Sequence, residues 1–245
     1  MDEKNDLNIA YKLVRLKLSD PGKPYPLYVL TENPIPFGVW VSAQEGKRLE
    51  NGKVKARTGS KGGLSYRPGW HLSDIPLATH IGKTNKNDNS RSIHWMHEDE
   101  VWCECRYSSD INYQAEADSR GWENGKFSTV RAQLDHIPEN GYYRYKTNPS
   151  MLGKWIIAGK IMVVRILSDD EVAKICRSKG YEPLPRENPL DKRLLGEYNL
   201  AQNDEIDAKP ISVVKKITQL KVEASTLSQT PDVKKDWKTV KDVEI

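Results

Sequence analysis

Alternating apolar and polar positions predict β-strands along much of the chain. Residues 10–18 alternate, with Val14, Leu16 and Leu18 on one side and Arg15 and Lys17 on the other, which is the period of a half-buried strand. Residues 101–107 alternate in the same way. Further strands are predicted over 25–30, after an Asp20-Pro-Gly turn, and over 38–42, 155–158 and 160–167, the last two meeting at Gly159.

One helix is predicted directly after the last of these strands. Ser168 and Glu171 form a capping box ahead of an amphipathic stretch that ends at Gly180. Val172 and Cys176 fall on one face of that stretch. We therefore expect this helix to pack against the sheet through that face.

Two further helices are predicted from weaker signals. Ser73 or Asp74 can cap a short helix that has Pro76 in its first turn and Gly82 beyond its end. Residues 210–224 carry apolar side chains at helical spacing. The segments 44–63 and 83–100 are polar and are predicted to be loops, and the segment 110–154 is predicted to be irregular.

Together these elements predict an α+β fold. We expect a mixed, mostly antiparallel sheet of about six short strands with few short helices. The main domain is expected over residues 1–185. Residues 186–245 are expected to form a polar extension, partly helical or disordered, because apolar residues become scarce there.

Composition narrows the class of protein. The longest apolar run, 155–167, is interrupted by charged residues and is shorter than the ~20 residues that a membrane span needs. The N-terminus is acidic and polar, unlike a secretory signal. We therefore expect a cytoplasmic protein without a membrane partner. The net charge of +4 comes without a cluster of lysines and arginines. Such a small, unclustered charge does not argue for an extended DNA-binding surface, but it permits an anionic ligand.

Cysteine and histidine spacing does not favour a metal site. Cys103 and Cys105 point to the same face of a strand and are poorly placed to bridge each other, which favours free thiols in a reducing compartment. His94 and His97 are near them in sequence, but this combination does not match the usual zinc spacings. No metal is predicted.

The segment 66–82 gathers the side chains that are most useful for chemistry. Pro68-Gly69 forces a bend there, so a guanidinium, an indole and an imidazole are expected to face one space. Arginine binds phosphate or carboxylate, tryptophan stacks on bases, and histidine donates or titrates near neutral pH. These residues predict a nucleotide-type ligand site, with His71 as a catalytic residue. The ligand-binding residues expected are Tyr66, Arg67, Trp70, Asp74 and His80. The alternative is structural: Trp70 in the core, Arg67 paired with an acid and the histidines bonded to backbone.

Glu104 is a second catalytic candidate. It follows Cys103 on a strand and shares a face with Trp102 and Arg106, where a carboxylate can act as a base or orient a hydroxyl. Pairing with Arg106 is the structural alternative. The aromatic run 141–148 is expected to stack bases or to form core.

The order of these segments resembles a family of phage and mobile-element proteins that carry an Arg-Pro-Gly-Trp-His core, here residues 67–71. The likeness spans roughly residues 9–180 and includes Val101-Trp-x-Glu104. Members occur alone or as domains of large polyvalent proteins. The resemblance implies a phage or mobile-element context, and no particular reaction.

Residues 69–82 are also similar to the middle element of ADP-ribosyltransferases. That resemblance implies an NAD-dependent transferase in which Arg67 or His71 contacts NAD, Trp70 stacks on it and Glu104 polarises the ribose. The chain has no His-Gly-Thr or Ser-Thr-Ser element. Two hypotheses follow: an NAD-using enzyme, and a non-enzymatic module that binds a host protein or nucleic acid. A nuclease that uses His71 and His80 is a third.

Overall fold

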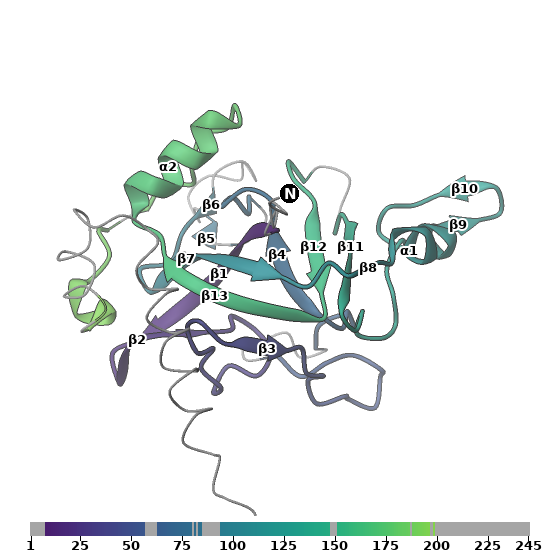
Figure 1. Ribbon diagram of the computed structural model, residues 1–245, viewed down its shortest axis with the longest axis horizontal. Helices are drawn as coiled ribbons and strands as arrows, with labels where there is room; N and C mark the ends of the chain where they lie inside the picture. The colour runs from purple at the N-terminus through teal and green to yellow at the C-terminus, as the bar shows by residue number, and fades with distance from the viewer. Residues whose placement is uncertain are drawn as a thin grey trace, which may run out of the picture. The chain divides into compact units, whose positions relative to one another are not determined.

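A computed structural model shows a mixed α and β chain built mainly of antiparallel strands (Figure 1). The structure describes residues 8–56, 63–79, 81, 83–84, 94–147, 151–186, 188–196 and 198. All of these belong to the unit Met1–Asn199. The helix predicted over 210–224 lies outside the described residues.

The main sheet has nine strands, and its order is β3-β13-β7-β1-β4-β12-β11-β8, with β2 also paired to β1. All its pairings are antiparallel except that of β11 with β8. The strands are β1 (Ile9–Lys17), β2 (Asp20–Tyr25), β3 (Trp40–Ser42), β4 (Trp70–Ser73), β7 (Glu100–Tyr107), β8 (Ile111–Asn112), β11 (Gly141–Tyr145), β12 (Trp155–Ala158) and β13 (Lys160–Ile166).

The remaining elements are short. Two small hairpins pair β5 (Lys83–Thr84) with β6 (His94–Trp95) and β9 (Trp122–Glu123) with β10 (Lys126–Phe127). The helices are α1 (Gln114–Gly121), α2 (Asp169–Ser178) and the 3-10 turn η1 (Lys192–Leu195). In Figure 1, α1 and the β9–β10 hairpin extend beyond the β11 side of the sheet, and α2 lies at the opposite side. No described helix is long and apolar enough to cross a membrane.

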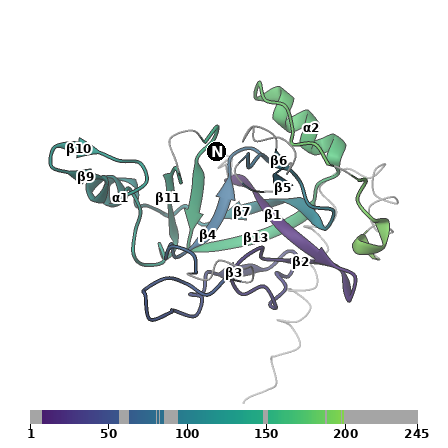
Figure 2. The ribbon, with the colours of Figure 1, turned by 180° about the vertical axis from the view of Figure 1, so that it is seen from behind.

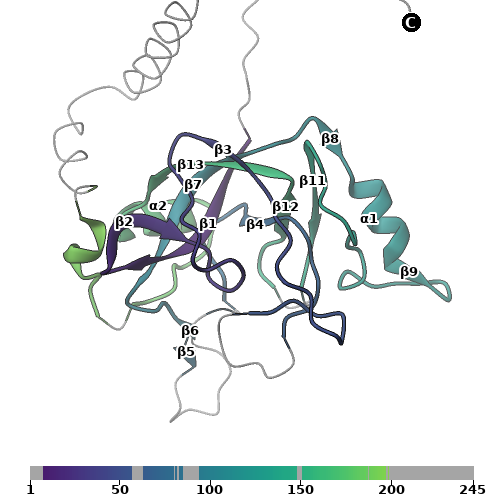
Figure 3. The same cartoon turned by 90° about the horizontal axis from the view of Figure 1, so that it is seen from below.

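Gly159 turns the chain through a corner that bends the sheet. Only this residue separates β12 from β13, yet three strands lie between them in the sheet order. A methyl group at Gly159 would lie 2.3 Å from the carbonyl oxygen of Pro138. The Gly159 carbonyl accepts a hydrogen bond from the amide of Ala43 at 2.7 Å. The corner therefore holds the end of β3 close to β12, as the view from below shows (Figure 3).

Both faces of the sheet are buried. One core gathers Leu13, Trp102, Tyr145, Trp155 and Ile157 with α2. The second core lies on the opposite face and is built by Val14, Leu72, Cys103, Ile156, Val163 and their neighbours. Because β1 and β12 supply side chains to both cores, they are central strands in Figure 2 and not the half-buried strands that alternation alone suggests.

Several predicted elements are confirmed. The strands over 10–18, 38–42, 101–107, 155–158 and 160–167 correspond to β1, β3, β7, β12 and β13. The capping box is present, since Ser168 Oγ accepts from the amide of Glu171 and the Glu171 carboxylate accepts from the amide of Ser168. Val172 and Cys176 are buried. The cysteines are free and buried.

Other predictions are wrong. The strand predicted over 25–30 ends at Tyr25, because Asp20-Pro-Gly lies within β2 and the turn falls at Leu18, which is exposed. Residues 74–79 form no helix, because Ser73 is paired within the sheet to Tyr11 and Trp155. The segment 110–154 is not irregular: it holds α1 and four strands. The sheet is also larger than the six strands expected.

We expect Gly159→Ala to destabilise the protein by about 3 kcal/mol, because the added methyl group overlaps a backbone oxygen that cannot move freely. Gly125→Ala is the control: it has φ +72° with nothing near its Cβ position, so it costs only about 1 kcal/mol of backbone strain. Urea unfolding of the two variants measures the difference. Equal losses would show that the corner does not constrain the sheet.

Candidate functional site

A cavity of about 380 Å³ lies at the start of β4. Residues 64–71 line it without interruption, so the whole Arg67–His71 motif faces this space. Residues 26–30 and 43–46 form other parts of the lining, together with side chains from β1, β11 and β12. None of the described residues of β7, the strand that carries Glu104, contributes to it.

Gly69 gives the motif its bend. Its φ is +117°, a conformation that side-chain-bearing residues rarely adopt. A Cβ here would lie 2.5 Å from Ile157 Cγ2 on β12. The backbone therefore packs directly on β12, and the residues on either side of Gly69 are turned toward the cavity.

His71 is held as a neutral ring. Nδ1 lies 3.2 Å from the carbonyl oxygen of Gly69, and Nε2 lies 3.3 Å from the hydroxyl of Tyr145. Since a carbonyl only accepts, Nδ1 carries the proton and Nε2 accepts from the tyrosine. Burial, together with the nearby charges of Lys12 and Arg67, lowers the pKa of His71 to about 3. The expectation that His71 titrates near neutral pH is therefore corrected.

Trp70 is half-buried and has a structural partner. Its Nε1 donates to the carbonyl oxygen of Val41 on β3 at 3.0 Å. The face of the indole lies 5.0 Å from Nζ of Lys12, a cation–π distance. Part of the structural alternative thus holds for Trp70, although the residue also lines the cavity.

Arg67 has no acidic partner among the described residues. Its Nε is buried and makes no hydrogen bond within the described part of the chain. Its guanidinium carbon lies 5.8 Å from the centre of the Tyr145 ring. An arginine without a carboxylate, placed in an aromatic cavity, is suited to receive an anionic group.

Tyr66 and Glu45 form a second polar group of the lining. The Tyr66 hydroxyl donates to the Glu45 carboxylate, and the Arg48 guanidinium lies 3.2 Å from the centre of the Tyr66 ring. These contacts connect segment 43–46 to the residues just before the motif. Glu45 is the one acidic residue among the described residues that line the cavity.

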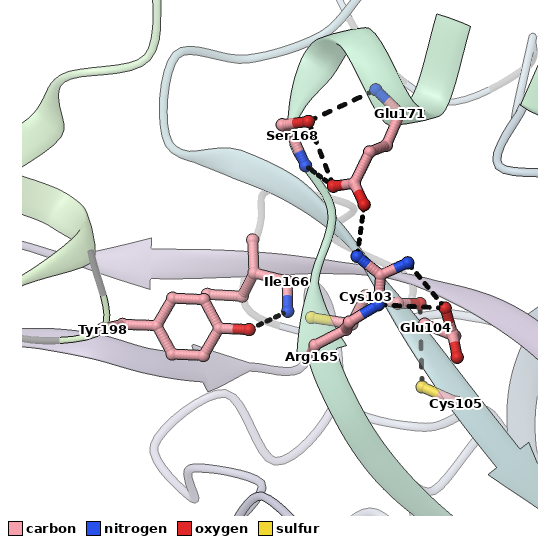
Figure 4. Close-up of polar contacts among 8 residues, drawn as sticks. All are labelled: Cys103, Glu104, Cys105, Arg165, Ile166, Ser168, Glu171 and Tyr198. Atoms are coloured by element: carbon pink, nitrogen blue, oxygen red, sulfur yellow. Dashed lines mark hydrogen bonds and ion pairs between the residues drawn. The ribbon is translucent and has the colours of Figure 1, made fainter. Parts of the chain in front are cut away.

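Glu104 lies elsewhere, in an ion-pair network (Figure 4). Its Oε2 accepts from Arg165 Nη2 at 2.9 Å and from Arg165 Nε at 3.1 Å. The same guanidinium donates to Glu171 at the start of α2. Glu104 therefore has a structural role, as the alternative held, but its partner is Arg165 on β13 and not the expected Arg106, and the pair anchors β7 to β13 and α2.

Asp74 and His80 are the two remaining residues predicted for the site. Asp74 is exposed, and it is not among the described lining residues. His80 lies outside the described residues. Within the described part of the chain, no three histidine, cysteine or acidic side chains gather as a metal site. Burial raises the pKa of Cys105 to about 12, so its thiol is neutral.

Lys12 and Trp155 line the cavity although no sequence motif pointed to them, and Tyr145 lines it as a member of the aromatic run 141–148, which was expected to stack bases or to form core. Lys12 had a signal, because it shares a strand face with Ala10 and Val14 and so occupies an apolar position. Tyr145 and Trp155 reach the cavity only because β11 and β12 pair next to β4. No local pattern shows that pairing.

Comparisons with protein-family models, with curated proteins and with solved structures found no match. The likenesses to the Arg-Pro-Gly-Trp-His family and to ADP-ribosyltransferases therefore remain predictions from the sequence.

We expect His71 to stay neutral in the folded protein from pH 8 down to about pH 4, since its pKa is lowered to about 3. Above the ordinary value of about 6.5 both folded and unfolded states are neutral. Below it the unfolded chain takes up a proton that the folded chain does not, so stability falls as the pH drops from 6.5 toward 3.

NMR of the imidazole carbons and urea unfolding at several pH values measure both effects. His71→Gln is the matched control, because it keeps an amide donor and acceptor without a titrating group, and its stability should depend less on pH in this window. A His71 resonance that titrates near pH 6.5 would contradict the assignment.

Proposed function

We propose that the cavity at Arg67–His71 binds a nucleotide-class small molecule. One observation carries the proposal: Arg67 lines an aromatic cavity with its Nε buried and unpaired among the described residues. Leaving such a donor unsatisfied costs about 1–3 kcal/mol. A phosphate that accepts from Arg67 would recover that cost.

The charge and shape of the lining support the same ligand class. Its described charged residues are Lys12, Arg67 and Glu45, two cations and one anion. Ring faces for a base come from Trp70 and Trp155, and Tyr66 and Tyr145 are close by. A volume of about 380 Å³ lies toward the lower end of the ~300–1,000 Å³ usual for ligand pockets. The space suits one nucleotide, or one half of a dinucleotide.

NAD-dependent ADP-ribosyl transfer is the enzymatic form of this proposal. Arg67 would grip the phosphate, and Trp70 would stack on a ring. His71 would act as a fixed hydrogen-bonding group and not as an acid, because both its nitrogens already have partners. Glu104 is engaged by Arg165 outside the cavity, which leaves Glu45 as the described carboxylate in reach of a bound ribose.

A non-enzymatic binding module is the second candidate, and one observation favours it. Trp122 and Phe127 are 60% and 43% exposed and face each other across the β9–β10 hairpin, with ring centres 5.4 Å apart. Exposed aromatics of this kind are frequent at interfaces with proteins or nucleic acids. In either form, the Arg-Pro-Gly-Trp-His likeness supports a phage or mobile-element accessory role.

Titration calorimetry with AMP and with NAD tests the binding proposal. We expect saturable binding that weakens at least about tenfold in Arg67→Ala, the effect of one charge-assisted hydrogen bond. Arg131→Ala is the control, because Arg131 pairs with Glu123 on the exposed hairpin and should leave the affinity unchanged. The melting temperature of each variant shows that loss of binding is not loss of fold.

Nicotinamide release in the same samples separates the enzymatic form from simple binding. Release that is abolished by Glu45→Gln and retained in Glu104→Gln would support transfer at this cavity. Binding without release would support a nucleotide sensor. No heat with AMP or NAD at millimolar concentration would overturn the proposal and leave the exposed Trp122–Phe127 pair as the candidate surface.

A further inference from the structure

Lys12 is a buried lysine at the wall of the cavity. It lies on β1 between β7 and β4 and is 8% exposed. Its neighbours on the same strand face, Ala10 and Val14, are completely buried. Lys12 is nevertheless one of the residues that line the cavity.

The surroundings of Nζ offer little compensation for a positive charge. It donates to the carbonyl oxygen of His71 at 3.2 Å and faces the Trp70 ring. Among the described residues no carboxylate lies within ion-pair distance of it. From β7, the nearby groups are the thiols of Cys103 and Cys105, whose own pKa values are raised by burial, so they are neutral.

The other titratable groups near Lys12 do not stabilise its protonated form. His71 on β4 is neutral, and the Arg67 guanidinium before it is a like charge. Glu45 lines the same cavity but accepts from Tyr66. Burial lowers the pKa of Lys12 to about 8. A substantial fraction of the amine is therefore unprotonated near neutral pH, as nucleophilic lysines require.

We propose that Lys12 captures an anionic aldehyde ligand as an imine. The Nζ lone pair attacks the carbonyl carbon, and the C=O π electrons move to oxygen, which takes a proton. The carbinolamine then loses its hydroxyl as water, and nitrogen releases a proton as C=N forms. An amine and an aldehyde give an imine and one water, with no change of oxidation state.

The cavity itself selects the class of aldehyde. Aromatic walls favour a planar ring, and Arg67 favours an anionic substituent such as a phosphate. The requirement for an anion rests on the proposed function of this cavity. The requirement for an aldehyde rests only on the burial and setting of Lys12.

Pyridoxal 5′-phosphate is a suitable probe, because it is planar, anionic and an aldehyde. The full-length protein is treated with it at pH 8, reduced with borohydride, and digested for mass spectrometry. The exposed Lys126 on β10 is the internal control. We expect Lys12 to be labelled at least about tenfold faster, because an ordinary lysine with a pKa of about 10.4 is less than about 1% neutral at this pH.

Three further measurements decide the origin of the label. The Lys12 labelling rate should rise with pH and level off above about pH 8, since the lowered pKa leaves the amine mostly neutral there. AMP should protect Lys12 from labelling. Lys12→Arg should remove the fast label and leave the label on Lys126, with circular dichroism confirming the fold. If that variant does not fold, the ratio of the Lys12 labelling rate to the Lys126 labelling rate in the wild-type protein still tests the proposal.

Pyridoxal, which lacks the phosphate, separates the two parts of the inference. Equal labelling of Lys12 by both aldehydes would overturn the anionic requirement and the proposed function, and would leave imine capture standing. Labelling spread evenly over the exposed lysines, with Lys12 no faster than Lys126, would overturn the capture itself.

Discussion

The corner at Gly159 is the constraint on which the candidate site depends. The strands on either side of it belong to different parts of one sheet, β12 next to β4 and β13 next to β3. The corner is tight enough to exclude a methyl group, and its carbonyl binds the amide of Ala43. It therefore holds Ala43, the first residue of the 43–46 segment, at the end of β12, the strand that pairs with β4. Without this bend, two walls of the cavity would lie apart.

Local contacts around residues 67–71 then place charged and aromatic side chains along the cavity between these walls. Gly69 packs on β12, and Trp70 donates to Val41 of β3, so the motif is fixed from both sides. The same packing buries Lys12 and the Nε atom of Arg67, without carboxylates beside them among the described residues. Two cations held in an apolar setting are costly unless a ligand compensates them. That cost is the physical reason for assigning a ligand to this space.

The sequence predicted individual strands and the residue types of the site better than it predicted which distant residues lie next to one another in the fold. Alternation found β1, β7 and β13, and the Ser168–Glu171 capping box fixed α2, because these signals are local. The motif residues Arg67, Trp70 and His71 do line one cavity. Glu104 was misplaced because its partner, Arg165, is far away in sequence. The neutral state of His71 depends on Tyr145, which only strand pairing brings near. The Asn124-Gly125 hairpin had a known turn signal that irregular composition obscured.

The most direct test of a ligand at this cavity is an NMR titration of the labelled protein with AMP. The account predicts saturable shifts that cluster at the amides of Gly46, Gly69 and Tyr145, while Glu104 and Arg165 remain unchanged. Shifts confined to residues 122–127, or no shifts at millimolar AMP, would contradict it.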